Sequence, residues 1–284
     1  MDGIIIINKP KNCTSHDIVR KAKKAFNEKV GHTGTLDPNA TGVLPLLVGK
    51  GTQIAKYIIN HDKIYEATLQ LGEKTDTADV EGVVIETKYI PKESLQTEIV
   101  NKVLQSFIGK QEQIPPIYSA IKVNGKKLYD YARKGEKVEI KPRQIEIYHM
   151  ELIKIDVQNK TVEFRVHCSK GTYIRTLCEN IAEKLGTVGY MKELNRTKVG
   201  EFSIDDSITI EELENANYNN FITVEDYFEN YKNINLNEKK LQLFLNGVQL
   251  TWNLEDGIYR IYCDNQFIGI GTIKNNLLKR DIIL

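Results

Sequence analysis

The chain has 284 residues, of which 41% are hydrophobic and 27% charged, the composition of a globular protein long enough to bury a substantial core. Its formal net charge of +1 excludes nucleic-acid binding through overall charge, so an anionic partner would need a local basic patch. The four cysteines form no Cys-x-x-Cys pair, and the apolar run at residues 4–7 is too short for a signal peptide or a membrane span, so we expect a cytoplasmic protein without a zinc site.

A strand and a helix are predicted first. Residues 3–7 are mostly β-branched, which is typical of a strand buried on both faces, and the Lys9-Pro10 step should end it. Thr14 and Asp17 have the spacing of a capping box and predict a helix that continues to Phe26.

The segment from Gly31 to Gly42 concentrates three glycines and one proline around a single carboxylate, Asp37. The proline after Asp37 disfavours the helical region, so we expect Asp37 at a sharp bend. The apolar run at residues 43–48 follows at once and would anchor this loop to a core. The composition of residues 31–42 also fits an ordinary turn. The pattern alone therefore leaves open whether this loop holds a reactive carboxylate or is a plain turn.

Further along, Thr52 can cap a short helix. Residues 63–71 alternate between apolar and polar and predict a strand with Tyr65 on its inward face, where it would be either a core or a site tyrosine. Residues 75–81 are acidic and polar and are read as a plain loop or an edge, and a helix is predicted over residues 93–108.

Residues 110–145, the basic insert, interleave lysines and arginines with tyrosines. The Asn124-Gly125 dipeptide predicts a hairpin turn, followed directly by Lys126 and Lys127. Such a mixture suits a surface that contacts phosphates and stacked bases, although a solvated basic face has the same composition.

Residues 162–168 alternate as a strand, and the apolar spacing from Ile174 predicts a helix with Arg175 in its first turn. A cation there opposes the helix dipole by roughly 0.3–1 kcal/mol, so we expect a compensating anion. A buried carboxylate would serve, and so would a bound phosphate.

Residues 215–240 are polar and rich in asparagine, and we expect a connector with one short helix. From Leu241 onward, Asn246-Gly247, Asp256-Gly257 and Asp264-Asn265 mark turns between short strands. The sequence therefore predicts a catalytic domain over residues 1–232 and a small β-rich domain over residues 233–284.

Several of these segments resemble one family. Gly31 to Pro45 is similar to the signature of the bacterial tRNA pseudouridine-55 synthases, the B-type family of pseudouridine synthases. The Lys63-Ile64-Tyr65 triplet, the Pro-Pro-x-Tyr-Ser-Ala run at residues 115–120 and the Lys-Gly-Thr-Tyr-Ile-Arg run at residues 170–175 resemble further family motifs in the same order. Asn195 stands where the family has an arginine, and residues 267–271 resemble a truncated domain of the pseudouridine-synthase-and-archaeosine (PUA) type.

The resemblance implies an α+β fold with a mixed, largely antiparallel sheet, flanking helices, a central active-site cleft and the small β-rich domain. It implies Asp37 as the catalytic carboxylate, Arg175 as its ion-pair partner, Tyr65 against the target uracil and His32 stacking in the space that the base leaves. The other residues that it places at the site or on the RNA are Lys9, Lys126, Lys127, Tyr173, Leu194 and Arg196.

The activity implied is isomerisation of uridine 55 in the T loop of tRNA to pseudouridine, without a metal or another cofactor. The partner would be the T stem-loop of tRNA, with no guide RNA and no membrane, and the enzyme would act as a monomer. Two other classes stay open: a glycosidase, which needs a second carboxylate that neither Asp76 nor Asp79 offers in a plain loop, and a non-catalytic RNA-binding protein.

Overall fold

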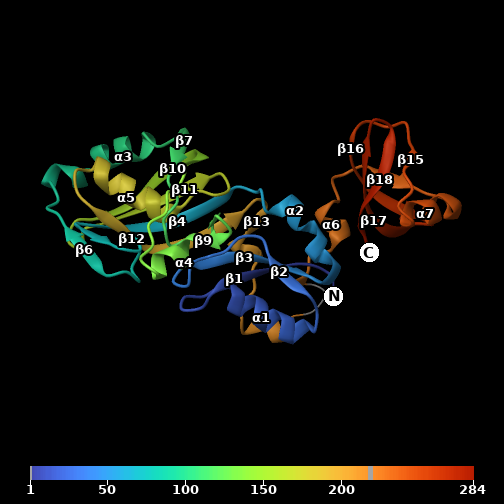
Figure 1. Ribbon diagram of the computed structural model, residues 1–284, viewed down its shortest axis with the longest axis horizontal. Coiled ribbons are helices and arrows are strands. Elements are labelled where there is room, and N and C mark those ends of the chain that lie inside the picture. Colours follow the sequence, from blue (N-terminus) through green and yellow to red (C-terminus); the bar gives the residue numbers. More distant parts are fainter. Residues whose placement is uncertain (1, 217–219) are drawn as a thin grey trace.

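In the computed structural model, which describes residues 2–216 and 220–284, nine strands form one mixed sheet (Figure 1). Its main path is β1-β3-β12-β4-β11-β10-β7, with β2 added to β3 and β13 added to β12. The nine strands are β1 (Gly3–Lys9), β2 (Val30–His32), β3 (Thr41–Val48), β4 (Lys63–Leu71), β7 (Gly109–Gln113), β10 (Arg143–Asp156), β11 (Thr161–Cys168), β12 (Gly189–Val199) and β13 (Phe202–Ser203). The predicted strand over residues 63–71 is confirmed, with Tyr65 buried on its inward face.

Among the strand pairs that the structure describes in this sheet, only β3 and β12 are parallel, and they join at two residue pairs, Thr41 with Asn195 and Gly42 with Arg196. Gly42 has a φ of 106°, and a Cβ atom there would lie 2.2 Å from the Arg196 carbonyl oxygen. Since only glycine permits this approach, Gly42 is needed to join the two halves of the sheet. The largely antiparallel sheet that we expected is confirmed, and the loop before β3 lies at its junction.

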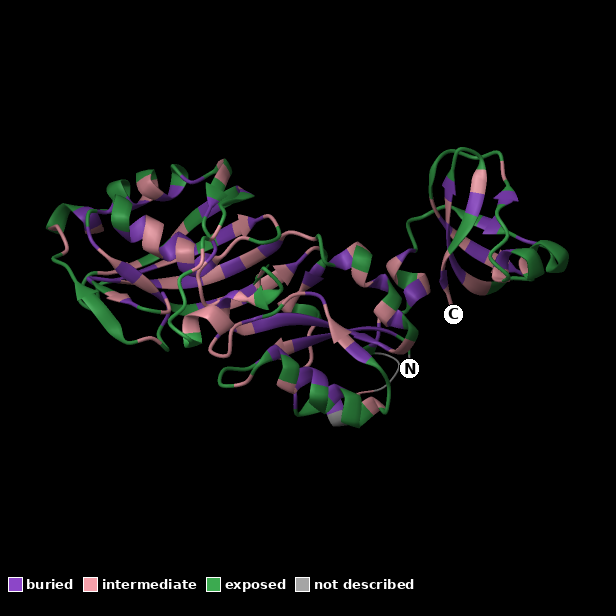
Figure 2. Cartoon of the chain, viewed as in Figure 1, coloured by how far each residue is buried: buried purple, intermediate pink, exposed green. Residues whose placement is uncertain are grey.

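Helices cover each half of the sheet (Figure 1). Helix α1 (Ser15–Phe26) packs on β1 and β3, while α3 (Thr97–Gln105) and α5 (Ile174–Lys184) pack on the half that contains β4, β10, β11 and β12. Figure 2 shows the buried residues concentrated along these strands and on the inner sides of the helices. The core therefore has a part in each half, and the half with α5 carries Tyr65 and Leu36.

Local signals at helix ends were correct in some places and wrong in others. The capping box of Thr14 and Asp17 is formed at α1. Thr52 does not cap a helix, because a 3-10 turn (Gly49–Ile54) precedes α2 (Ala55–Ile58) and the Thr52 hydroxyl donates to the Gly49 carbonyl. The helix expected over residues 93–108 is shorter, since Gln96 is extended (ψ 137°) and separates a 3-10 turn (Lys92–Leu95) from α3. Two other 3-10 turns cover Ile204–Asp206 and Glu212–Asn215.

Two small hairpins extend from the main sheet. One pairs β5 (Glu73–Thr75) with β6 (Val84–Thr87). The other pairs β8 (Lys122–Val123) with β9 (Lys126–Lys127) and leads into α4 (Leu128–Arg133). Asn124 and Gly125 have φ values of 49° and 81°, so the predicted two-residue turn is confirmed.

A second sheet of five strands follows in the order β14-β16-β17-β18-β15. Its elements are β14 (Asn233–Asn235), β15 (Leu250–Thr251), β16 (Gly257–Cys263), β17 (Gln266–Lys274), β18 (Leu277–Ile283) and α7 (Glu238–Leu245). A β-rich C-terminal part is confirmed, but Leu241 lies in α7 and not in a strand. Within the expected connector, α6 (Val224–Tyr227) is one short helix, and residues 217–219 lie outside the described part.

The smaller part projects from the larger one beside α2 and α6 (Figure 1). Ile270 and Ile282 share a buried cluster with Ile54, Ile58 and Phe228 of the larger part. Lys56 and Tyr57 of α2 also contact the Asp281 carboxylate. An apolar seam and a polar contact thus hold the two parts together. Within the described ranges, no helix has the length and apolar character needed to cross a membrane.

Candidate active site

Asp37 lies in the loop between β2 and β3, and buried side chains from other elements hold that loop. The Ser15 hydroxyl, at the start of α1, accepts from the Leu36 amide (2.9 Å) and donates to the Leu36 carbonyl (3.1 Å). Lys9 Nζ donates to the Pro38 carbonyl (3.0 Å) and to two carbonyls of the turn before α1, which accounts for its three N–H groups. The backbone on both sides of Asp37 is therefore fixed independently of any ligand.

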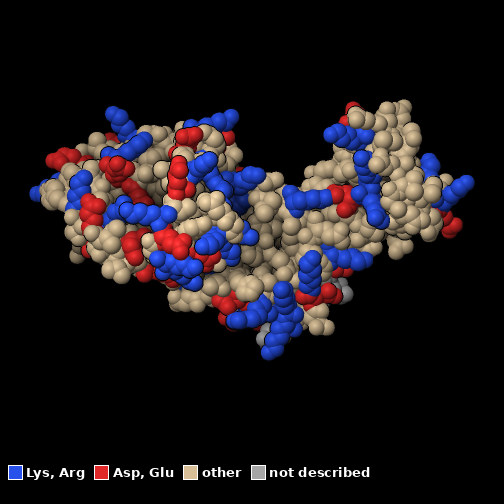
Figure 3. Space-filling model, viewed as in Figure 1, with Lys and Arg blue, Asp and Glu red and all other residues tan. Residues whose placement is uncertain are grey.

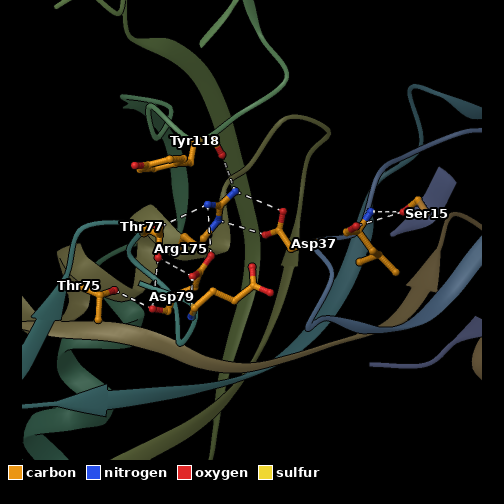
Figure 4. A network of polar contacts seen from close by, with 9 residues as sticks. Ser15, Asp37, Thr75, Thr77, Asp79, Tyr118 and Arg175 are labelled. Carbon is orange, nitrogen blue, oxygen red and sulfur yellow. Dashed lines mark hydrogen bonds and ion pairs between the residues drawn. The ribbon is translucent and has the colours of Figure 1, made fainter. Parts of the chain in front are cut away.

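Arg175, in the first turn of α5, forms an ion pair with Asp37. Arg175 Nε lies 3.1 Å from one carboxylate oxygen of Asp37, and Nη2 lies 3.3 Å from the other. Nη2 also donates to the Tyr118 carbonyl (2.9 Å) and Nη1 to the Thr77 carbonyl (3.3 Å), as Figure 4 shows. The predicted ion pair is present, and its two-pronged geometry fixes the direction of the carboxylate.

A second carboxylate, Asp79, lies on the far side of the same guanidinium (Figure 4). Its Oδ2 atom is 3.4 Å from Arg175 Nη1, and its Oδ1 atom accepts from the Thr77 hydroxyl at 2.6 Å. The expected loop is present between β5 and β6, but it is not a plain acidic loop, because Asp79 contacts Arg175 of α5. Two acids thus share one buried cation, and Asp79 does not line the cavity that Asp37 faces.

The charges around Asp37 oppose one another. Burial raises the pKa of the Asp37 carboxyl above its usual value, and the Asp79 carboxylate adds to this effect. Arg175, and more weakly Lys9, favour the ionised form. Asp37 is consequently a half-buried carboxyl group whose protonation is set by opposing effects of burial and of its ion pair, as is common at functional sites.

A cavity of about 370 Å³ opens beside Asp37, a size in the range of small-molecule sites. The cavity is lined by residues of four segments: Thr33 to Asp37, Ile59 to Tyr65 in part, Tyr118 to Ala120, and Ser169 to Arg175, together with Met191, Leu194 and Arg196. Six of the residues expected at the site therefore line it: Asp37, Tyr65, Tyr173, Arg175, Leu194 and Arg196.

Tyr65 and Arg196 form adjacent parts of the wall, because they are opposite one another in the β4–β12 pairing. Arg196 is 1% exposed and donates from Nε to the Val43 carbonyl (2.8 Å) and from Nη2 to the Gly34 carbonyl (2.9 Å). Burial raises the pKa of the Tyr65 hydroxyl above its usual value near 10. Tyr65 thus presents a neutral phenol to the cavity at neutral pH.

The other expected residues do not line the cavity. Lys9 is fully buried beneath the loop, so it holds the loop in place and does not face the solvent. His32 ends β2 next to the cavity; burial lowers the pKa of its imidazole, and its buried Nδ1 atom has no hydrogen-bond partner in the described residues. Lys126 and Lys127 lie on the β8–β9 hairpin, over the rings of Tyr131 and Tyr129.

The basic insert contacts the site through Tyr118, whose carbonyl accepts from Arg175, and through the amide side chain of Gln113. The Gln113 side chain accepts from the Tyr173 amide (2.8 Å) and donates to the Tyr173 carbonyl (3.0 Å), which ties the end of β7 to the start of α5. Figure 3 shows Lys and Arg side chains over both parts of this face, with acidic side chains among them. Since the net charge is only +1, any positive potential at the site must come from the cations that line it and not from the protein as a whole.

Sequence reasoning missed three residues at the site: Asp79, Lys63 and Lys170. Lys63 and Lys170 line the cavity, and Asp79 supports Arg175 from behind. Lys63 was visible as the first residue of the Lys-x-Tyr motif, but its position as an inward residue of β4 had not been drawn out. Asp79 carried no comparable signal, because its partner is remote in the chain.

Comparison with known families accounts for this arrangement. The N-terminal domain of the TruB family pseudouridylate synthases matches residues 21–174. The chain belongs to the TruB family of pseudouridylate synthases. The C-terminal domain described for tRNA pseudouridylate synthase B matches residues 175–239, and the C-terminal domain of pseudouridine synthase II TruB matches residues 233–279. The chain is accordingly an isomerase of the pseudouridine synthase class.

Curated relatives are similar over nearly the whole chain. Proteins named tRNA pseudouridine synthase B are 44% identical in Clostridium kluyveri, covering 97% of this chain and 96% of that protein, and 46% identical in Clostridium tetani, covering 95% of each. A protein of the same name in Caldanaerobacter subterraneus is 42% identical over 98% of each chain.

Two solved structures share the fold. A Cbf5-Nop10-Gar1 complex contains a chain with a TM-score of 0.68 and 24% identity, covering 99% of this chain and 83% of that one. An H/ACA RNP bound to a substrate RNA containing 2′-deoxyuridine gives a TM-score of 0.68 and 23% identity, covering 99% and 85%. These matches support the α+β fold and nothing finer.

Proposed function

We propose that this enzyme converts uridine 55 in the T loop of tRNA to pseudouridine, with Asp37 as the catalytic carboxylate. The observation that carries the proposal is the geometry of Asp37, whose carboxylate is paired with Arg175 and lies in the wall of a cavity that Tyr65 and Tyr173 also line. The curated relatives, which are named for tRNA, support tRNA as the substrate, and the choice of uridine 55 rests on the family resemblance of residues Gly31 to Pro45.

The reaction breaks the bond between N1 of uracil and C1′ of ribose, turns the base and joins C5 to C1′. The C5 atom loses its proton and N1 gains one, so no atom enters or leaves overall. Asp37 either adds to the uracil ring, attacks C1′ or acts as a base, and Arg175 keeps its carboxylate oriented during the step. The fixed backbone of Leu36 and Pro38 holds Asp37 without reorganisation.

Tyr65 packs against the uracil ring and takes part in removing the C5 proton through its neutral hydroxyl. Because burial raises its pKa, the phenolate form is scarce at neutral pH, which favours transfer through a water molecule over direct abstraction. Tyr173 and Leu194 bound the base from other sides of the cavity, which excludes bulk water from the reacting atoms.

To enter this cavity the uridine must leave its stack, and we propose that His32 occupies the space that it vacates. Lys126 and Lys127 on the hairpin of the basic insert contact phosphates of the T stem-loop. Residues 1–232 form the catalytic domain, and residues 233–284 form a small RNA-contacting domain of the PUA type. The enzyme acts as a monomer in the cytoplasm and needs no guide RNA.

The test is conversion of an unmodified tRNA transcript, with pseudouridine mapped in the T loop, for the parent, Asp37→Asn and the control Asp264→Asn. Asp264 lies in the β16–β17 turn with a φ of 48°, which asparagine tolerates. We expect conversion at position 55 by the parent and the control, and none by Asp37→Asn with binding retained. Conversion at another uridine would refute the substrate, and unchanged conversion by Asp37→Asn would refute the role of Asp37.

A glycosidase is disfavoured on geometry, because Asp79 is turned toward Arg175 and does not reach the cavity. A protein that only binds RNA would show tRNA binding without conversion in the same experiment.

A further inference from the structure

Lys63 is a buried cation in the wall of the Asp37 cavity. It is the first residue of β4, is 8% exposed and lines the cavity. Its ammonium group donates to the backbone carbonyl of His61. Within residues 2–216 and 220–284, no Asp or Glu forms an ion pair with it, since the carboxylate of the neighbouring Asp62 contacts His167 instead. The positive charge of Lys63 thus lacks a protein counter-ion.

The other cations of the cavity differ in their partners. Arg175 is shared by Asp37 and Asp79. Lys170 is exposed, and its Nζ atom lies 2.5 Å from the Asn60 side-chain oxygen. Arg196 is buried with two backbone carbonyls as partners and, like Lys63, has no acid partner among the described residues. Lys63 and Arg196 together therefore make one side of the cavity wall positive.

A buried charge without a counter-ion is unfavourable in the free protein. Burial, with the nearby Arg196 cation as the next cause, lowers the pKa of Lys63 to about 8. An anion entering the cavity would offset both the burial of the unpaired Lys63 charge and its repulsion from Arg196. The structure therefore contains a place where a negative group of the substrate gains more than it would at an exposed lysine.

The position of Lys63 indicates which group that is. Lys63 is opposite Cys168 in the β4–β11 pairing, directly before Ser169 and the exposed Lys170, and Ile59 on the same side is 53% exposed. We take this side as the mouth of the cavity because its lining residues Ile59 and Lys170 are exposed, although Lys63 itself is buried. When a base enters, its sugar-phosphate backbone stays at the mouth, beside Lys63.

We propose that Lys63 binds a phosphate group flanking the uridine that is isomerised, with Arg196 adding to the positive potential. This inference rests on the proposed function, because it assumes that an RNA nucleotide enters the cavity. It deepens that function by adding a requirement: the substrate is an internal nucleotide of a polynucleotide, recognised at its own backbone inside the catalytic site.

The test is a binding experiment on synthetic T stem-loop RNAs, in which one of the two phosphates flanking the target uridine is replaced by a neutral methylphosphonate. Both proteins carry Asp37→Asn so that no conversion occurs, and one also carries Lys63→Met. For unmodified RNA we expect Lys63→Met to weaken binding about tenfold and to make the slope of log K against log salt less negative by about 0.7. One of the two methylphosphonate RNAs should bind about tenfold more weakly than unmodified RNA to the protein that retains Lys63. The same RNA should bind less than twofold more weakly than unmodified RNA to the protein with Lys63→Met.

Lys184→Met is the matched control. Lys184 lies at the end of α5, where its Nζ contacts the Ser106 hydroxyl and the Phe107 ring, and it does not line the cavity. This variant should keep full sensitivity to the methylphosphonate. A general structural defect would weaken the binding of all the RNAs to the same extent. Loss of a phosphate contact would instead make binding insensitive to the methylphosphonate at that one position.

Equal effects of the methylphosphonate with and without Lys63 would overturn the proposal. So would tight binding of both methylphosphonate RNAs by the protein that retains Lys63, an outcome that does not depend on whether Lys63→Met folds. Lys63→Gln provides a second variant for the same comparison. Failure of the proposed function is read separately, as absence of conversion by the protein with Asp37 intact.

Discussion

Arg175→Lys tests whether the geometry of the guanidinium, and not its charge alone, holds the site together. Arg175 is buried and contacts Asp37 through two nitrogens, Asp79 through a third contact, and the carbonyls of Thr77 and Tyr118. A lysine has one nitrogen with three N–H groups and cannot span acceptors on opposite sides of a planar fork. At least one carboxylate is then left buried without its hydrogen bonds.

Hydrogen bonds to charged groups contribute roughly 1.5–3 kcal/mol each, and breaking a buried ion pair costs about 3–5 kcal/mol. We expect Arg175→Lys to lower the free energy of unfolding by about 3 kcal/mol, measured by urea denaturation, and to lower kcat about 100-fold through misplacement of Asp37. The pKa of Asp37 should rise further, which moves the acidic limb of the kcat profile to higher pH.

The matched control is Arg165→Lys. Arg165 also contacts two carboxylates, those of Glu66 and Glu151, but its side chain is 44% exposed, so the loss should stay below about 1 kcal/mol. A stability loss for Arg175→Lys no larger than that of Arg165→Lys, or an unchanged kcat, would refute the reasoning.

Three further predictions follow from single sites. Gly42→Ala should lower the free energy of unfolding, measured in urea, by about 3 kcal/mol, because the added Cβ meets the Arg196 carbonyl. The control Gly125→Ala, where φ is 81° and the space is open, should lower it by only about 1 kcal/mol. Equal losses in the two variants would contradict this reasoning. The folded protein lowers the pKa of Lys63 from 10.5 to about 8, so between these pH values it binds fewer protons than the unfolded chain. The free energy of unfolding of the parent should therefore rise by up to about 3 kcal/mol as the pH increases from 8 to 10.5. Urea unfolding curves of Lys63→Met at the two pH values should lack this rise. A pH-independent difference between the two proteins would argue against the charge penalty. Tyr65→Phe should lower kcat at least tenfold in the tRNA assay and leave the unfolding curve within about 1 kcal/mol of the parent; unchanged kcat would exclude its hydroxyl from proton transfer.

The sequence by itself determined the elements whose signals are local. Alternation over residues 63–71 is a period-two pattern, and the structure places a strand there with Tyr65 inward. Thr14 and Asp17 bond within one turn of chain, and Asn124-Gly125 needs only its own backbone. The resemblance in the loop that carries Asp37 also came from a contiguous run of residues.

Only the tertiary structure decided which of these elements meet. Asp37 and Arg175 are 138 residues apart, and they pair because the β3–β12 contact brings the loop before β3 to the start of α5. Asp79 was expected in a plain loop and Lys9 at the site or on the RNA, yet Asp79 supports Arg175 and Lys9 lies fully buried under Pro38. Periodicity reports which face of its own element a residue occupies, whereas burial and charge pairing depend on the neighbours of that element in the sheet. For that reason the supporting contacts of Lys9 and Asp79 became visible only in the tertiary structure, whereas the pairing of Arg175 with Asp37 was already implied by the family resemblance.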